Sequence, residues 1–183
     1  AQLNIDWEFI EYDAVIFNSF FTEKWEAYSC QNHFYSSLPH EQDFFALNEL
    51  QIRGLLNHDF VVLPGFCGDL LGGSITAFQT NDYTLDGLEK LIQFKHFKGV
   101  EFPLDGLEKE GSIDDYSTFY DRYQHWYVCN KVSKFIVNSV RVYEYFGGTW
   151  LLPLWDDDLL SYWYSLPYAV RKKQKLYNQV LFE

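Results

Sequence analysis

A short apolar run leads directly into a glycine-rich loop, and this junction constrains the fold more than any other stretch of the chain. The run is FVVL at 60–63, and PGFCGDLLGG follows at 64–73. A short apolar run bounded by turn residues predicts a buried strand. Glycines let the backbone turn tightly or approach a ligand closely. The junction predicts either a strand-to-helix turn capped by Asp69, or a loop that holds a charged ligand.

The order of the predicted elements favours an α/β fold. WEFIEYD at 7–13 alternates apolar and polar residues, which predicts a second strand. Few strands separated by long helical stretches fit a partly parallel sheet with a predominantly helical C-terminal part. Helices are predicted at 14–30, at 40–56, over 113–148 as one helix or two ending at Gly147–Gly148, after Asp156, and at the basic C-terminal end.

The length of 183 residues and the hydrophobic fraction of 48 % predict one globular domain over 1–183. The sequence contains no methionine, begins in strand-like residues and stops at QVLFE within a helical pattern. We therefore expect the chain to be a fragment, truncated at both ends.

Charge and composition exclude several classes of partner. The net charge is −12, from 14 basic and 26 acidic residues, which argues against binding to nucleic acid or to anionic lipid. No run of apolar residues is long enough to span a membrane. The cysteines Cys30, Cys67 and Cys129 are widely spaced and form no CxxC motif, which predicts reduced thiols in a cytoplasmic protein.

A six-residue sequence, LDGLEK, occurs at 85–90 and again at 104–109. Two copies are too few for a repeat architecture. They predict two similar helix starts with Asp86 and Asp105 near the caps, or two turns centred on Gly87 and Gly106.

A second motif lies far downstream of the glycine loop. PLWDDDLLSYWYSLPYAVRKKQKLY at 153–177 runs from a Pro-x-x-Asp segment through a helix and a proline to a basic stretch. Together with VVLPGFCGDLLGGS, this resembles the synthetase domain of asparagine synthetase-like proteins. Within this family, the residues of the two motifs are most similar to those of the branch linked to surface-polysaccharide gene clusters. That branch includes sugar amidotransferases. The resemblance covers roughly residues 5–183 and implies that the chain is the C-terminal portion of that domain.

The resemblance implies a partial adenine nucleotide alpha hydrolase-like fold and an ATP pyrophosphatase activity. Such enzymes adenylate a substrate, release pyrophosphate and let ammonia displace AMP. By this resemblance the cofactors are ATP and Mg²⁺, and Asp69 is the magnesium-binding acid of the loop. The loop glycines that would shape the nucleotide site are Gly65, Gly68, Gly72 and Gly73.

The same resemblance assigns two downstream residues. Asp156 matches the Asp of the family's Pro-Phe-Leu-Asp segment, which orders a helix near the site; an acid there is also a helix cap. Lys175 matches the lysine that stabilises charge developing on the phosphates, although Lys172 and Lys173 are close enough in sequence to take that role.

The chain departs from the family pattern in four places. The upstream Ser-Gly-Gly-x-Asp-Ser motif, which holds pyrophosphate, is absent, and so is the Glu-x-Arg before the downstream motif. Leu70 stands where the loop usually has a Glu. No glutaminase domain is present, so a separate glutaminase subunit would supply ammonia. We expect the chain alone to be inactive, and the acceptor to be an amino acid or a sugar.

Two other functions compete with this one. A non-catalytic binding module, either a degenerate synthetase or a fragment, has the same motifs without turnover. A glycoside hydrolase is suggested only by the aromatic residues, 20 % of the chain, and by acid pairs such as Asp114–Asp115.

Three further groups of residues have simple structural interpretations. His125 and Cys129 have a metal-capable spacing of four, but no third ligand is indicated, which disfavours a metal site. His33 and His40 flank a loop and predict surface or hydrogen-bonded roles. Arg141 and Glu144 predict an ion pair on a helix surface.

Overall fold

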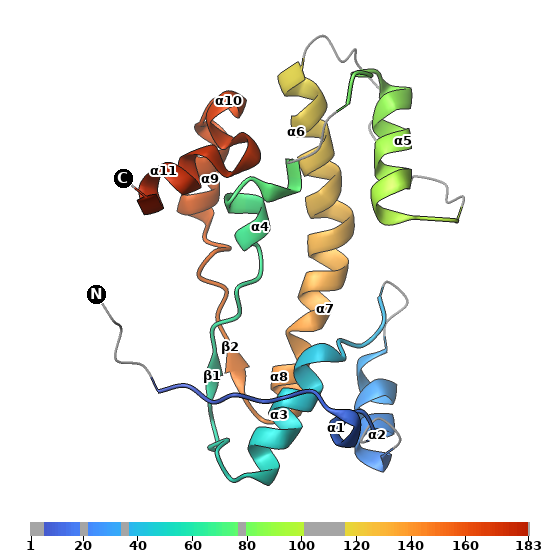
Figure 1. Ribbon diagram of the computed structural model, residues 1–183, viewed down its shortest axis with the longest axis vertical. Helices are drawn as coiled ribbons and strands as arrows, with labels where there is room; N and C mark the ends of the chain where they lie inside the picture. The colour runs from blue at the N-terminus through green and yellow to red at the C-terminus, as the bar shows by residue number, and fades with distance from the viewer. Residues whose placement is uncertain (1–5, 19–21, 34–36, 77–79, 101–115, 183) are drawn as a thin grey trace. The chain divides into compact units, whose positions relative to one another are not determined.

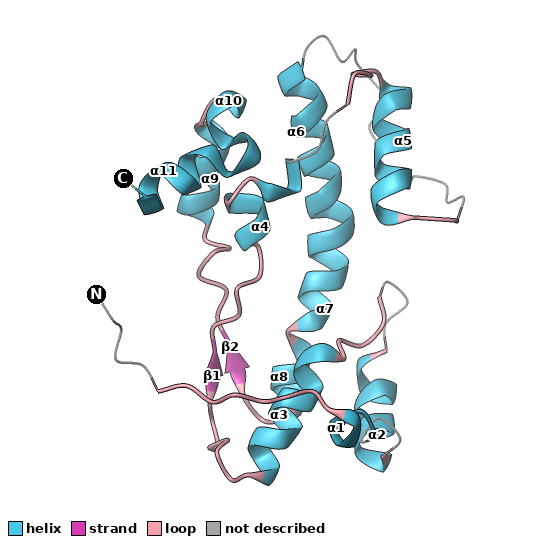
Figure 2. Cartoon of the chain, in the orientation of Figure 1, coloured by secondary structure: helices cyan, strands magenta, loops and turns pink. Residues whose placement is uncertain are grey.

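The computed structural model describes residues 6–18, 22–33, 37–76, 80–100 and 116–182. The chain divides into two compact units, one formed by Ala1–Val62 with Val137–Leu151 and the other by Leu63–Ile136 with Leu152–Glu183. Helices predominate among the described residues, and two short strands pair in the first unit (Figure 2). The expected combination of few parallel strands and many helices is confirmed at this coarse level.

The first unit contains five helices and two strands among its described residues. They are α1 (Ala14–Asn18), α2 (Glu23–Asn32), α3 (Gln42–Ile52), β1 (Val61–Val62), α7 (Val137–Ser139), α8 (Arg141–Tyr145) and β2 (Thr149–Trp150). The strands are parallel, with Val61 opposite Thr149 and Val62 opposite Trp150 (Figure 1). Because they are parallel, the chain leaves both strands at the same end of the sheet.

Aromatic side chains fill the core of the first unit. The rings of Tyr28 and Phe44 stack with centroids 4.9 Å apart, and both side chains are fully buried. Tyr143 donates a hydrogen bond of 2.6 Å to Asp43, whose carboxylate also lies 3.7 Å from His40 Nε2. The hydrogen bond from His40, with that from Tyr143, holds the pKa of Asp43 below its usual value. The predicted hydrogen-bonded role of His40 is therefore confirmed.

Two predictions for the N-terminal region are wrong. Residues 7–13 form no strand; Asp13 instead accepts bonds from the backbone N–H groups of Val15 and Ile16 at the start of α1. An alternating pattern makes a strand only where a neighbouring strand pairs with it. The single helix predicted at 14–30 is also interrupted, because Thr22 accepts from Trp25 N and begins α2 as its N-cap.

The second unit is helical throughout its regular structure. Its elements are α4 (Gly68–Leu71), the 3₁₀-helix η2 (Ser74–Thr76), α5 (Leu85–His96), α6 (Tyr116–Tyr127), the π-helix η3 (Val128–Ile136), α9 (Asp157–Ser165), α10 (Tyr168–Arg171), the 3₁₀-helix η4 (Lys172–Gln174) and α11 (Lys175–Phe182). Helices α5 and α6 lie side by side (Figure 1), and Leu88 and Ile92 of α5 share a core with Phe119 and Tyr123 of α6.

The stretch predicted as one helix or two over 113–148 is a series of helical segments, α6, η3, α7 and α8, in the described part that begins at residue 116. Gly147 follows α8 with φ +84°, and its N–H bonds to the carbonyl of Glu144. The predicted glycine C-cap is confirmed. Arg141 and Glu144 form the predicted ion pair, at 3.5 Å.

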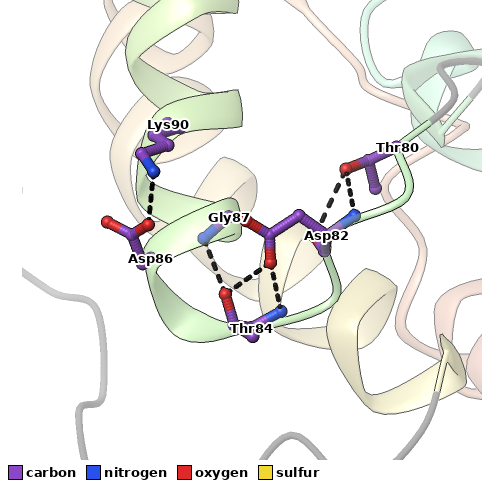
Figure 3. Close-up of polar contacts among 6 residues, drawn as sticks. All are labelled: Thr80, Asp82, Thr84, Asp86, Gly87 and Lys90. Atoms are coloured by element: carbon purple, nitrogen blue, oxygen red, sulfur yellow. Dashed lines mark hydrogen bonds and ion pairs between the residues drawn. The ribbon is translucent and has the colours of Figure 1, made fainter.

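The first LDGLEK copy is a helix start (Figure 3). The N-cap is Thr84, whose Oγ1 accepts from Gly87 N at 3.1 Å, while Asp86 lies in the first turn and pairs with Lys90. Asp82 in turn accepts from the backbone N and the hydroxyl of Thr84. A Cβ on Gly87 would lie 2.4 Å from the carbonyl oxygen of Asp82, so only glycine fits there. The second copy lies outside the described residues.

Candidate functional site

The two sequence motifs start from neighbouring strands. PGFCGDLLGG follows β1 directly, and the segment that leads to Asp156 follows β2. Within the second unit the motifs touch: the ideal Cβ position of Gly68 lies 3.4 Å from Leu154 Cδ1.

The glycine loop forms a single turn of helix, α4. Cys67 precedes this turn in the left-handed region, with φ +70°, which is rare for a residue with a side chain. Its carbonyl accepts from the N–H groups of Leu70 and Leu71. Asp69 is exposed in this turn, and Ser74 Oγ donates to its carboxylate at 3.0 Å. The loop thus presents one accessible carboxylate beside a strained backbone position.

A pocket of about 220 Å³ opens at this loop. Three of its lining residues, Asp69, Cys67 and Tyr127, have polar side chains, and the others have apolar side chains or are glycines. The lining residues are Gly65, Phe66, Cys67, Gly68, Asp69, Leu70, Tyr127, Val132 and Ile136. A volume below the range of about 300–1,000 Å³ usual for ligand pockets suits a small group rather than a whole nucleotide.

Burial keeps two of these polar groups protonated at neutral pH. It raises the pKa of the Cys67 thiol to about 11. It also raises the pKa of Tyr127 to about 12, with smaller contributions from the nearby Asp69 and Cys67. Tyr127 is therefore a hydroxyl donor, and Cys67 is not a thiolate nucleophile. The one carboxylate among the lining residues does not supply the pair that a glycoside hydrolase needs.

His96 and Lys131 lie close to the ring of Tyr127. His96 Nε2 is 3.0 Å from the hydroxyl of Tyr123, and its ring centroid is 6.0 Å from that of Tyr127. Burial, with the charges of Lys131 and Lys95, lowers the pKa of His96 to about 4. His96 is thus neutral at pH 7. Lys131 Nζ lies 5.2 Å from the centroid of the Tyr127 ring.

The four loop glycines divide into two pairs. Gly65 and Gly68 line the pocket, whereas Gly72 and Gly73 are buried against protein. Gly73 has φ +74°, and a Cβ there would lie 1.9 Å from the carbonyl oxygen of Arg171. The structure therefore gives Gly73 a packing role, and contact of Gly72 and Gly73 with a nucleotide stays a prediction.

Arg171 is the residue that the sequence reasoning missed. It stands first in the basic stretch, where only lysines were predicted to have a functional role, yet only 3 % of it is exposed. Its guanidinium donates to Gln124 Oε1, Asp121 Oδ1 and the carbonyl of Leu166, each at 2.9 Å. Arg171 therefore links α10 to α6, while its own carbonyl contacts the glycine loop.

The sequence reasoning also missed Tyr127 and His96, because the aromatic residues of a helix are usually interpreted as part of the hydrophobic core.

Asp156 and the lysines of the downstream motif lie at a helix start and on the surface, respectively. Asp156 is the N-cap of α9 and accepts from Leu159 N at 3.0 Å, so its capping role is confirmed. Lys175 is exposed at the first residue of α11. Lys173 is exposed in the left-handed region, with φ 52°. The choice among the three lysines stays a prediction.

The loop offers oxygen donors of the kind that Mg²⁺ prefers. No three His, Cys, Asp or Glu side chains in the described ranges are grouped so that they could hold an ion. Asp69 with the Ser74 hydroxyl fits Mg²⁺, which uses one or two carboxylates and completes its shell with water and phosphate oxygens.

No helix among the described residues has the length and apolar character needed to cross a membrane.

Comparisons with protein-family models, with curated proteins and with solved structures found no match to this chain.

Proposed function

We propose that this chain is part of an asparagine synthetase-like, ATP-dependent amide-forming ligase with a partial adenine nucleotide alpha hydrolase-like fold. The observation that supports this most is the meeting of the two motifs within one unit. The glycine loop contacts Leu154 and the Arg171 backbone, although about 80 to 100 residues separate them in sequence. A simple turn would need no such partner, whereas this enzyme class builds its site from these two segments.

The proposed chemistry assigns a task to each side chain. ATP with Mg²⁺ supplies the adenylation that turns a carboxylate oxygen into a leaving group. Asp69 would hold the ion that carries the phosphates, and Lys175, or its neighbours Lys172 or Lys173, would neutralise negative charge that grows on them. The nucleotide or activated substrate could approach the backbone of Gly65 and Gly68 closely, because neither residue has a side chain.

The volume of the pocket limits which reactant it could bind. A space of about 220 Å³ with apolar walls, one carboxylate and the Tyr127 hydroxyl accommodates a small acceptor, an amino acid or a sugar, next to the activated group. Tyr127 would donate a hydrogen bond to an acceptor oxygen. A separate glutaminase would supply ammonia, and the reaction would take place in the cytoplasm and contribute to the modification of sugars for surface polysaccharide.

Calorimetric titration of this chain with Mg²⁺–ATP tests the proposal. Asp69→Asn should weaken binding at least tenfold, because it removes the charge that holds the ion. Asp158→Asn is the matched control: it is also an exposed acid in the first turn of a helix, it loses the same charge, and it should bind like the parent. Absence of binding by the parent chain, or equal binding by both variants, would refute the assignment.

The non-catalytic alternative has its own signature. If the chain is a binding module, Mg²⁺–ATP binds and depends on Asp69, but no pyrophosphate is released even from a form of the protein that carries a Ser-Gly-Gly-x-Asp-Ser segment upstream, when ammonia and candidate acceptors are supplied. Lys172→Gln, Lys173→Gln and Lys175→Gln compared in the same titration identify the lysine that contacts the phosphates.

A further inference from the structure

The end of α6 carries an exposed cysteine–histidine pair that the proposed function does not use. Cys129 Sγ lies 3.6 Å from His125 Nε2. The two residues are four apart, which places them on one face of the helix. Both are exposed, so the pair is open to a solute.

From this geometry we propose that His125 and Cys129 form a surface site for a borderline-soft divalent metal ion such as Zn²⁺. Zinc bonds of about 2.3 Å to sulfur and about 2.0 Å to nitrogen, at a tetrahedral angle of about 109°, place the two ligand atoms about 3.5 Å apart. The observed separation matches this spacing, so the ion could enter without rearrangement of the backbone.

The backbone at this position is unusual. The chain passes from α-helix to the π-helix η3 between Tyr127 and Val128, that is, between the two ligands. π-Helical segments are rare and occur frequently at functional sites. The hydrogen bond from Ser133 Oγ to the carbonyl of Cys129 adds to the local order of the segment.

The chemistry of the pair selects the metal. A thiolate and an imidazole nitrogen favour Zn²⁺ and similar ions and disfavour Mg²⁺, which requires oxygen ligands. Binding replaces the thiol proton, which passes to solvent, and no electron is transferred. Asp121, one turn before His125, accepts from Arg171 Nη2, and no group of three ligands is present in the described part of the chain. Water therefore completes the shell, and the affinity should be well below that of a four-ligand structural site.

Titration with Co²⁺ as a spectroscopic substitute for Zn²⁺ tests the site. The parent chain, kept reduced, should develop a thiolate-to-cobalt charge-transfer band that excess Zn²⁺ abolishes and excess Mg²⁺ leaves unchanged. Cys129→Ser should remove the band, and His125→Ala should weaken Co²⁺ binding at least tenfold. Far-UV circular dichroism should show that both variants remain folded, since both side chains are exposed.

Matched controls are available elsewhere in the chain. Cys30→Ser and His58→Ala alter an exposed cysteine and an exposed histidine outside the pair, and both should keep the band and the affinity. A parent chain without the band, a band that survives in Cys129→Ser, or unchanged affinity in His125→Ala would overturn the proposal.

Discussion

Gly73 and the carbonyl group of Arg171 are in such close contact that a Cβ on Gly73 would lie 1.9 Å from the carbonyl oxygen. This contact joins the glycine loop to the basic segment, and both residues are buried. The two halves of the candidate site are thus held together by backbone, with the Arg171 side chain anchored separately to α6.

Gly73→Ala should destabilise the second unit by more than about 2 kcal/mol, because the new methyl group meets both an unfavourable positive φ and the Arg171 carbonyl. Gly99→Ala separates these two causes, since Gly99 has φ +78° with nothing within 4 Å of its Cβ position. It should cost only about 1 kcal/mol. Urea denaturation of both variants measures the difference; equal losses would mean that the loop moves away from Arg171 freely.

Arg171→Met should cost about 2–4 kcal/mol, because it leaves the buried oxygen of Gln124 without its donor. Gln124 is fully buried, and its Nε2 has no hydrogen-bond partner among the described residues. Asp121→Asn is the comparison, and it should cost about 1 kcal/mol or less, because the Asp121 side chain is 52 % exposed. Chemical denaturation of the two variants gives the values. A larger loss in Asp121→Asn would contradict the view that Gln124 is the critical partner.

Stability should fall as the pH drops from about 6.5 to about 4, because His96 has a pKa of about 4 in the folded chain and an ordinary value of 6.5 when unfolded. In that window the unfolded state binds a proton that the folded state does not, so protons favour unfolding. Above pH 6.5 the contribution no longer changes with pH.

The His96→Gln variant should show a weaker pH dependence between those limits than the parent chain does, in urea titrations at a series of pH values. His58→Gln, at an exposed histidine, should follow the parent. If His96→Gln and the parent have parallel curves, the acid sensitivity comes from other groups.

Asp156→Ala should destabilise the chain by about 1 kcal/mol, since it removes the acceptor for Leu159 N at the start of α9. Asp158→Ala, in the first turn of the same helix, removes only a favourable interaction with the helix dipole and should cost a few tenths of a kcal/mol. Thermal unfolding of both proteins distinguishes the cap from the charge. A cost for Asp158→Ala as large as that for Asp156→Ala would refute the assigned cap.

Local chemistry made several features predictable. The Asp156 cap, the Gly147 helix end and the ion pair of Arg141 with Glu144 each depend on residues within four positions of one another. Such signals act through the nearest backbone groups, so the sequence alone specifies them. The strand expected at 60–63 forms only at Val61–Val62, and the prediction that it is buried is wrong, because Val61 is 57 % exposed and Leu63 is 64 % exposed.

Features that depend on a distant partner could not be predicted. Residues 7–13 have a strand pattern but no strand to pair with. Arg171 has the sequence context of a surface cation and is buried because Asp121 and Gln124 approach it from α6. In both cases the outcome depends on which residues, distant in sequence, pack against the segment in the folded chain.

For the candidate site, the sequence by itself determined which residue types are present and in what order: a loop acid, its glycines and a downstream lysine segment. Only the tertiary structure decided that Gly73 meets Arg171 and that Tyr127 and Asp69 line the same pocket. The physical reason is that burial and backbone contact are properties of the packed chain: they set which glycines are needed for packing, which hydroxyl stays protonated and which carboxylate remains accessible.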